Sequence, residues 1–445
     1  MTFKKFMFLA MAILMSFSML FTACGSSENG SSQTTSENAG TQQASSETPT
    51  VSTEKVTVKF ANPWWLEPGR KELFEGFNQR FSEKFPQYTI EPVAISYSDY
   101  TDKMKIMLSS DAPDLFYVQQ TQIKLWQEMG YLEPLNDYLD IQQLLNDVSV
   151  PEAQKMTEFE GKMYALYAEA CPYSGLIYNK KMFEEAGVKV PTTPDELLDA
   201  ARKLTKGTSQ YGLITANTPD NPAHIMQHGM ITIHGFGGKI VLDNGEFGVN
   251  APEFIEGLTF YKKLNDSGAV PKAMNYTTQR KLFFAGKAAM CQDGGYFVTW
   301  AQSENEEVGK NLDVAYLPYP KKDNPIDLTY FSISSKAKSE VKNAAIEYLK
   351  FYMTPEVQAD WIESCGYPVT MKSAITTEYR EQYPWFQIYE DTAGYGIPLS
   401  VDGHETQSDE IRKVVADYIC KVLQMNEPVE KAMNDCKAEL DAMVK

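Results

Sequence analysis

Strand-like and helix-like patterns alternate along residues 55–118, and this alternation restricts the fold more than any other feature of the sequence. Val56, Val58 and Phe60 alternate with polar residues, as in a strand with one buried face. Leu or Phe then recurs at every fourth residue over 73–85, which predicts an amphipathic helix that ends before Pro86. Strand patterns over 90–95 and 114–118 enclose a second helical pattern over 100–108. This order of elements is typical of a parallel α/β sheet.

Apolar spacing and capping residues predict more helices further along the chain. Thr193 to Glu196 form a capping box with Pro194 at the first helical position. Asn250 to Glu253 are expected to cap another helix in the same way. Apolar residues with helical spacing predict further helices over 341–352, from Thr354 onward, over 411–422 and over 429–440. The chain has 445 residues, too many for one compact core, so we expect two domains.

The first 24 residues have the pattern of an export signal. Lys4 and Lys5 precede an apolar stretch over 6–21 that is interrupted only by two serines. The stretch is short for a membrane span and ends at small residues. The segment Leu20 to Cys24 resembles the lipobox of bacterial lipoproteins, which implies a signal peptide over 1–23 and a lipid on Cys24. The alternative is an ordinary signal peptide with an incidental cysteine.

The segment that follows is too polar to form a core. Residues 25–53 are almost entirely Ser, Thr, Gln, Asn, Gly, Ala and Glu. We interpret residues 24–53 as a lipidated cysteine followed by a disordered tether, with an r.m.s. reach of roughly 30 Å. The sequence thus predicts a lipid-anchored head at the outer face of the cytoplasmic membrane.

The charge of the chain excludes one class of partner. Lys and Arg number 41 against 59 Asp and Glu, which gives a formal net charge of −18. Such a surface repels phosphate backbones, so nucleic acid is not expected to bind.

The remaining cysteines suggest neither a metal site nor a disulfide framework. They have no CxxC spacing and are odd in number once Cys24 is assigned to lipid. We expect all five to be buried thiols. The alternative is that Cys420 and Cys436 face each other across a helical hairpin and form a pair. These residues are Cys171, Cys291, Cys365, Cys420 and Cys436.

Several motifs in a fixed order carry a resemblance to a known family. The most specific runs from Leu176 to Gly187, and the others lie at 109–115, 130–135, 161–166, 284–295 and 318–320. Two positions depart from the usual pattern, Ser110 where Gly is common and Pro194 where Trp is common. The chain resembles the family-1 extracellular solute-binding proteins, the lipoprotein receptors of sugar-importing ABC transporters, and is distantly similar to maltose-binding protein.

The resemblance implies an α/β, two-lobed periplasmic-binding-protein-like fold of the class II type. Each lobe would be a mixed sheet flanked by helices, with the ligand cleft between the lobes. Lobe one is expected over 54–168 plus about 328–368, and lobe two over about 169–327 plus 369–445. The chain would cross between lobes near 167–175, 316–329 and 367–373, and the lobes would close about this hinge. The implied protein is a monomeric receptor that is not an enzyme, needs no cofactor or metal, and hands a carbohydrate to ABC permease subunits.

Candidate ligand-binding residues follow from the chemistry of sugars, which present an apolar C–H face and a rim of hydroxyl groups. Flat aromatic rings stack on the first, and carboxylates or amides bind the second. Such residues should lie at strand ends, where an open α/β sheet leaves a crevice. Trp64, Trp65 and Glu67 follow the first strand. Two adjacent Trp in a loop are not expected to enter one core together, so we expect at least one of them to face the cleft. Gln119 and Gln120 follow the strand over 114–118, where the alternative is a solvated helix start.

The resemblance adds further candidates. Glu169 matches an acidic residue at the interdomain crossing, Tyr296 a ring that stacks on sugar, and Asp293 the turn before it. Asn217 opens a contact segment, and three residues lie near segments that border the cleft in relatives, although a structural role is expected for them: Tyr330, Trp385 and His404. Trp126, Trp300 and Trp361 fall at helical positions, where core packing is expected.

Other kinds of function remain as alternatives. A surface glycan hydrolase or lyase would place Glu169 and Asp293 on either side of a scissile bond. His224 and His228 have the spacing of a metal pair on a helix, but no acidic residue lies between them as in zinc proteases. Asp111 and Asp114 are expected to bond backbone amides of a turn. A metal or peptide receptor from another group of binding proteins is the third possibility.

Overall fold

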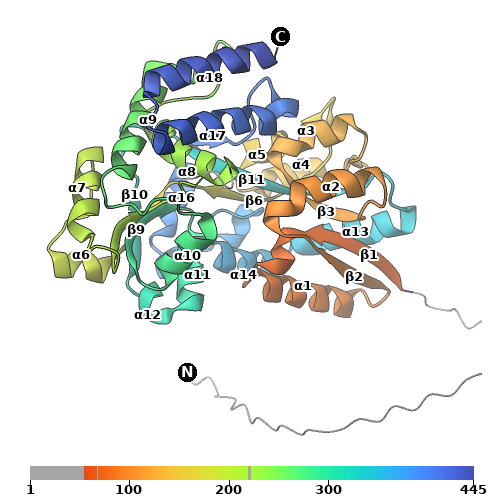
Figure 1. Cartoon of the computed structure of the whole chain (residues 1–445). Helices are drawn as coiled ribbons and strands as arrows, with labels where there is room; N and C mark the ends of the chain where they lie inside the picture. Colours follow the sequence, from red (N-terminus) through yellow and green to blue (C-terminus); the bar gives the residue numbers. More distant parts are fainter. Residues whose placement is uncertain (1–54, 68, 219–221, 445) are drawn as a thin grey trace, which may run out of the picture. The chain divides into compact units, whose positions relative to one another are not determined.

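Two β-sheets organise the described part of the chain, which in the computed structural model comprises residues 55–67, 69–218 and 222–444 (Figure 1). The expected signal peptide, Cys24 and the tether lie outside the described residues, as does the side chain of His224. None of the helices within these ranges is long and apolar enough to cross a membrane.

The larger sheet is mixed and contains six strands: five follow the order β12-β11-β3-β1-β2, and the sixth, β6, also pairs with β11. β1 pairs in parallel with β2 and β3, whereas β11 runs antiparallel to β3 and β6. Helix α1 (Arg70–Lys84) joins β1 to β2, and α2 (Tyr100–Ser109) leads to β3, so the predicted alternation is confirmed. The strands are β1 (Val56–Asn62), β2 (Tyr88–Ala94), β3 (Leu115–Gln119), β6 (Leu166–Pro172), β11 (Asn324–Ile333) and β12 (Gly396–Pro398).

The smaller sheet has four strands in the order β10-β7-β9-β8. β7 is antiparallel to both of its neighbours, and β8 is parallel to β9. Helix α7 (Pro194–Leu204) contacts β8, and α10 (Tyr276–Phe284) contacts β9. The strands are β7 (Gly175–Asn179), β8 (Tyr211–Ile214), β9 (Ala288–Asp293) and β10 (Leu312–Tyr316).

The other elements surround these sheets (Figure 1). The α-helices are α3 (Gln120–Glu128), α4 (Ile141–Asp147), α5 (Pro151–Lys155), α6 (Lys180–Ala186), α8 (Pro222–Gly235), α9 (Pro252–Asn265), α11 (Tyr296–Glu304), α12 (Glu306–Gly309), α13 (Ser339–Tyr352), α14 (Pro355–Cys365), α15 (Thr377–Gln382), α16 (Phe386–Ala393), α17 (Ser408–Gln424) and α18 (Val429–Met443). Short elements are the 3-10 helices η1 (Pro63–Leu66), η2 (Tyr97–Asp99), η3 (Lys372–Ala374) and η4 (Glu405–Gln407), and the two-residue strands β4 (Glu158–Phe159) and β5 (Lys162–Met163).

The chain passes directly from one sheet to the other at two places. β6 of the larger sheet is followed after two residues by β7 of the smaller sheet, and β10 of the smaller sheet leads to β11 of the larger. These passages lie next to each other because β6 and β11 are paired. The lobe boundaries given above stay a prediction.

The helix caps agree only in part with the sequence. The Thr193 side chain accepts a hydrogen bond from the backbone N–H of Glu196, as expected at the start of α7. The Glu196 carboxylate, however, accepts from the backbone and hydroxyl of Thr192, so the reciprocal half of the box lies one residue earlier. The prediction for Asn250 was wrong: Ala251 occupies the cap of α9, and the Asn250 amide instead donates to Asn434 on α18.

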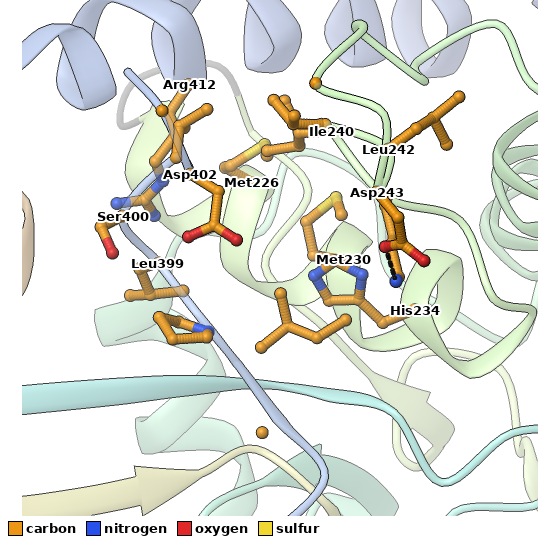
Figure 2. A pocket seen from close by; sticks show the side chains of 18 residues that line it. Met226, Met230, His234, Ile240, Leu242, Asp243, Leu399, Ser400, Asp402 and Arg412 are labelled. Atoms are coloured by element: carbon orange, nitrogen blue, oxygen red, sulfur yellow. Dashed lines mark hydrogen bonds and ion pairs between the residues drawn. The ribbon is translucent and has the colours of Figure 1, made fainter. Parts of the chain in front are cut away.

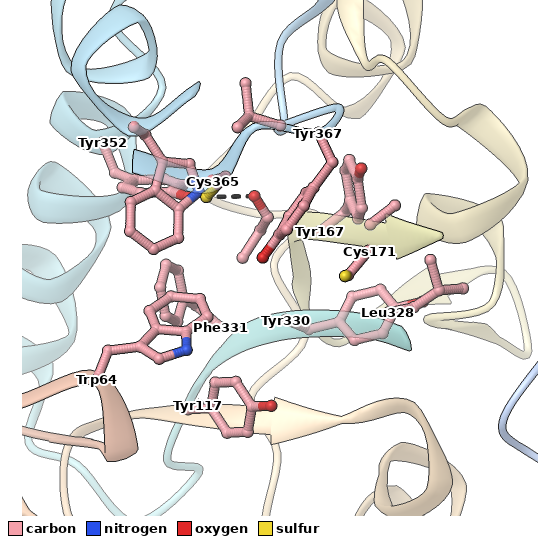
Figure 3. Packing of buried hydrophobic residues seen from close by; sticks show 14 of the residues in the cluster. Trp64, Tyr117, Tyr167, Cys171, Leu328, Tyr330, Phe331, Tyr352, Cys365 and Tyr367 are labelled. Atoms are coloured by element: carbon pink, nitrogen blue, oxygen red, sulfur yellow. Dashed lines mark hydrogen bonds between the residues drawn. The ribbon is translucent and has the colours of Figure 1, made fainter. Parts of the chain in front are cut away.

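Aromatic side chains fill the core at the end of β1 (Figure 3). Trp64 and Trp65 are both only 3% exposed, and both rings contact Phe74, at centroid distances of 5.5 and 5.3 Å. The expectation that two adjacent Trp cannot enter one core was therefore wrong, because the 3-10 helix η1 turns both rings toward α1.

The five cysteines of the described chain are free thiols. Four of them are buried as expected, but Cys420 on α17 is partly exposed. Cys436 lies in the core of the terminal helices and is not bonded to it. The prediction for the two turn aspartates was wrong about their partners: Asp114 accepts from the backbone N–H of Lys59 on β1 at 2.8 Å, and Asp111 lies 3.6 Å from the Lys59 ammonium group.

Candidate ligand-binding site

A cavity of about 250 Å³ lies where residues that follow strands of the larger sheet meet helices α10 and α11 beside the smaller sheet. Eight of its eighteen lining residues are Trp or Tyr. Aromatic walls of this kind suit a ligand with flat apolar faces. The lining residues are Trp64, Glu67, Arg70, Ser96, Tyr97, Tyr117, Glu169, Cys171, Tyr173, Gln227, Tyr276, Thr277, Arg280, Tyr296, Trp300, Asp327, Thr329 and Tyr367.

Arg70 is a buried cation at the start of α1 and is neutralised inside the cavity wall. Its guanidinium lies 3.3 Å from Oε1 of Glu169 and donates to the hydroxyl of Tyr367 at 2.6 Å. The same group lies 4.9 Å from the ring centroids of both Trp64 and Trp361, a cation–π arrangement. Because its charge is paired, Arg70 holds the wall together and leaves no free positive charge for an anion.

A second ion pair closes another side of the cavity. Nη1 of Arg280 on α10 lies 3.2 Å from Oε2 of Glu67, which follows η1. The Arg280 guanidinium also stacks over the rings of Tyr276 and Trp300, at 4.0 and 4.6 Å. This pair joins a segment of the larger sheet to a helix of the smaller one.

Several polar atoms of the lining residues are buried and have no hydrogen-bond partner among the described residues. They are Oδ1 of Asp327, Oγ1 of Thr329, Nε1 of Trp300, the hydroxyl of Tyr117, and Nε of both Arg70 and Arg280. Burial of a polar group without a partner is costly, and such groups are rare in native proteins. A ligand with several hydroxyl groups can both donate to and accept from this set.

Asp327 on β11 is the carboxylate of the cavity that is not in an ion pair with Arg70 or Arg280. Its Oδ2 accepts a hydrogen bond from the hydroxyl of Tyr97 at 3.3 Å. Burial, assisted by the nearby Glu169 carboxylate, raises the pKa of Asp327 to about 6. At neutral pH this side chain is therefore mainly a carboxylate that accepts hydrogen bonds.

The structure brings four of the predicted residues together in the cavity wall. Trp64, Glu67, Glu169 and Tyr296 all line it. They come from three separate parts of the chain, which only the tertiary fold places side by side.

Two other predicted residues form hydrogen bonds with lining residues but do not line the cavity themselves. Gln119 donates through Nε2 to the hydroxyl of Tyr97 at 2.6 Å. Asp293 accepts from the Tyr296 hydroxyl at 2.6 Å and from the backbone N–H of Gly294 at 2.8 Å. Burial raises the pKa of Asp293 to about 7. Neither side chain lines the cavity.

The remaining predicted residues lie outside the cavity lining and are engaged elsewhere. Trp65 donates through Nε1 to the backbone oxygen of Phe60 at 3.0 Å, and Gln120 donates to the backbone oxygen of Ile326 at 3.0 Å. The others have the following partners: the Asn217 Oδ1 accepts from the backbone of Met274, the Tyr330 hydroxyl donates to Ala153, the Trp385 ring packs edge-on to Tyr389, and the His404 ring stacks on Phe247.

Sequence reasoning did not select Arg70, Arg280, Asp327 or Trp300 for the site. Trp300 was expected in the core, but it is partly exposed and lines the cavity, because it stands one helical turn after Tyr296 on α11. A signal for Arg70 was present: it falls on the apolar stripe of α1, four residues before Phe74. Trp126 and Trp361 are fully buried, as predicted.

The alternative functions find little support in this geometry. Glu169 is bound to Arg70, and Asp293 does not line the cavity, so these two carboxylates do not flank a common space for a scissile bond. His228 is buried beside Tyr276. Within the described residues, no three His, Cys, Asp or Glu side chains form a group that could hold a metal ion.

A second cavity, of about 420 Å³, is larger but differs in chemistry (Figure 2). It lies between α8, the segment 239–245 and the segment 396–403, and its apolar lining includes Met226 and Met230. None of its lining residues is Phe, Tyr or Trp, and it contains no predicted site residue. A sugar would find no ring to stack on here, so we assign the candidate site to the smaller aromatic cavity.

Solved structures show which class of protein has this fold. The GacH receptor of Streptomyces glaucescens, solved with acarbose, is 21% identical and aligns with a TM-score of 0.75 over 86% of this chain and 97% of that chain. Maltose-bound MalE3 of T. maritima is 17% identical and aligns with a TM-score of 0.77 over 87% and 99% of the two chains. The fold is thus that of the two-lobed periplasmic binding proteins, and the predicted fold class is confirmed.

Residues 77–387 match the family described as bacterial extracellular solute-binding protein, and the chain belongs to this family. The maltotriose-binding protein of Pyrococcus abyssi is 28% identical over 315 residues, which are 68% of this chain and 64% of that protein. This chain therefore spans just under two thirds of that relative. The multiple sugar-binding protein of Streptococcus mutans is 22% identical over 339 residues, 72% of this chain and 76% of the relative.

Proposed function

We propose that this protein is the substrate-binding component of an ABC importer and captures an uncharged carbohydrate in the aromatic cavity. The ligand would be an oligosaccharide or a sugar derivative, and no bond is made or broken. The observation that carries the proposal is the combination of eight Trp and Tyr side chains with buried, unpartnered polar atoms in one cavity. Rings for C–H faces and free donors and acceptors for hydroxyl groups are what a sugar requires.

The charges of the cavity support an uncharged ligand over an anionic one. Arg70 and Arg280 are each paired with a glutamate, which leaves the Asp327 carboxylate as the unpaired charge of the wall. A sugar phosphate or sugar acid would meet this carboxylate, and the described lining residues offer it no unpaired cation. The charge of Arg412 acts on Asp327, but Arg412 lines the other, Met-lined cavity.

The names of relatives agree with this ligand class. Relatives include a maltotriose-binding protein and a multiple sugar-binding protein, and structures of the same fold were solved with acarbose and with maltose. Family members are extracellular binding proteins. We propose that the same work, delivery of an intact sugar to permease subunits, is done here by a monomer.

Binding would be coupled to closure of the two lobes. The cavity is built from strands of the larger sheet and from helices beside the smaller sheet, and adjacent strand passages join the two sheets. A ligand that contacts both sides binds the closed form more tightly than the open form, so it shifts the population toward closure. The closed form is then the signal that a permease recognises.

A saccharide screen tests the proposal. Heat stabilisation of the protein by neutral sugars, followed by calorimetry, should identify at least one sugar that binds and is recovered unchanged. Release of shorter products would instead support a glycan hydrolase or lyase, and stabilisation by peptides alone would support a receptor of another class.

A further inference from the structure

A third cavity, which we call the outer cavity, adjoins the aromatic (inner) cavity and shares part of its wall. The outer cavity has a volume of about 600 Å³, against about 250 Å³ for the inner one. Four residues line both: Glu67, Thr277, Arg280 and Trp300. The wall between the two spaces is therefore made of these side chains.

The Glu67–Arg280 ion pair is the part of this wall that comes from both sides of the site. Glu67 is fixed by its backbone N–H, which donates to the oxygen of Trp64 at 3.3 Å. The guanidinium of Arg280 is held in place by its contacts with the rings of Tyr276 and Trp300. The two charges meet at 3.2 Å, and each side chain is 23% exposed. Separation of the two sides would therefore break this contact.

The Glu67–Arg280 ion pair can break and re-form at a small cost in free energy. An ion pair that retains access to water contributes little net free energy, because both charges are readily hydrated when they separate. Its strength also depends on ionic strength, since salt screens partly exposed charges. A fully buried pair such as Arg70–Glu169 does not have this property, because its charges would be left without water.

The outer cavity offers chemistry that can accept more of the same kind of ligand. The rings of Trp300 and Phe284 and the polar side chains of Ser303 and Glu304 line it. The inner cavity, by contrast, is smaller than the roughly 300–1,000 Å³ of usual small-molecule sites. It has room for a short sugar, while a longer one would have to pass the ion pair to continue on this side.

We propose that the Glu67–Arg280 pair is a gate between the two cavities and selects short saccharides over longer ones. The proposal rests on the proposed function and assigns its length specificity. With the pair closed, a sugar occupies the inner cavity alone. Without the attraction between the two charges, the two side chains can move apart, so that the inner and outer cavities become continuous and additional sugar rings can enter the outer space.

The test compares affinities for di- and tetrasaccharides of four kinds: α-1,4-glucose, β-1,4-glucose, β-1,4-xylose and β-1,4-mannose. The double variant Glu67→Gln/Arg280→Met removes both charges together, so that neither is left unpaired. Calorimetry gives the ratio of tetrasaccharide to disaccharide affinity for each protein. For the series that binds, we expect this ratio to rise about tenfold in the variant, or about 1.4 kcal/mol.

Matched controls separate gating from general damage. Arg380→Met/Glu390→Gln removes another Arg–Glu pair, at 2.7 Å, whose residues line neither cavity, and should leave the ratio unchanged. Arg280→Lys keeps the positive charge and should keep a ratio close to that of the wild type. A measurement without mutation is also available: raising salt from about 0.05 M to about 0.5 M should raise the wild-type ratio by weakening the pair.

Each result bears on one of the two proposals. A ratio that is the same in the wild type and in the folded double variant, or a wild type that already prefers tetrasaccharides, overturns the gate and leaves sugar binding intact. A salt-independent ratio likewise overturns it if the double variant does not fold. Failure of the wild type to bind any of these sugars, or any other in the wider screen, rejects the proposed function, and the gate with it.

Discussion

Asp293 at the end of β9 gives the stability of this protein a pH dependence that one substitution should remove. The side chain is fully buried; its Oδ1 accepts from the Tyr296 hydroxyl and the Gly294 backbone, and its Oδ2 has no partner among the described residues. Burial raises its pKa from the ordinary 3.8 to about 7. Asp293→Asn replaces the carboxyl group by a neutral group of nearly the same shape.

The sign and size of the effect follow from this shift. Between pH 3.8 and pH 7 the folded protein keeps a proton that the unfolded chain releases, so the free energy of unfolding falls as the pH rises. Each pH unit in this window costs about 1.4 kcal/mol, and the loss levels off above the folded-state pKa. The asparagine side chain in the variant has no ionisable group, so this contribution to the pH dependence disappears. The stability of the variant relative to the wild type should therefore increase by about 2.5 kcal/mol between pH 5 and pH 7.

Urea unfolding followed by circular dichroism gives the free energy of unfolding of both proteins at pH 5 and at pH 7. The stability difference between variant and wild type is then compared at the two pH values. The contributions of the other titrating groups cancel in this comparison because both proteins contain them. Asp199→Asn, at an exposed position of α7, is the matched control. If the stability difference between Asp293→Asn and the wild type is the same at both pH values, or grows toward low pH, the raised pKa assigned to Asp293 is incorrect.

Three further predictions concern the cavity wall and the anchor. Trp64→Ala and Trp65→Ala should both lower stability, by about 3–5 kcal/mol, because both rings are buried in the core, but only Trp64→Ala should also lower sugar affinity, at least about tenfold; calorimetry and urea unfolding measure the two effects, and equal loss of affinity would contradict the assignment. Arg70→Met leaves Glu169 buried without a cation and should cost about 3–5 kcal/mol, of which addition of Glu169→Gln should restore a large part; an additive double variant would show that the pair is not coupled. Cys24→Ala should release the protein into the medium, which fractionation and blotting detect, and retention on membranes would argue against a lipid anchor.

The elements of the first part of the fold could be read from sequence because their signals are local. Two patterns placed β1 and α1 within a few residues of their observed bounds: the alternation of apolar residues from Val56 to Phe60, and the Leu or Phe at every fourth residue from Leu73. The cap at Asn250 failed because its amide is used by Asn434, 184 residues away. No local pattern reports such a partner.

In the candidate site, too, residues with a local sequence signal could be predicted, and residues that depend on a distant partner could not. Trp64 and Glu67 follow a strand end, a position that sequence can identify, and both line the cavity. Arg280 was missed because its role depends on Glu67, 213 residues away in the chain. Trp65 was selected with Trp64 because sequence cannot tell which of two adjacent rings faces a space and which donates its N–H to the core.

The position of β11 in the larger sheet has a consequence for how the chain acquires its structure. All ten of its residues are buried, and it pairs with β3 from the first third of the sequence and with β6 and β12. A ribosome needs roughly 10–40 s to add the residues that separate β3 from β11, so the early strands must wait that long with an open edge. Such long-range pairing folds slowly and exposes the nascent chain to aggregation. A chain cut short before Asn324 is thus expected to be held by chaperones or degraded, and cannot mature as an independent half.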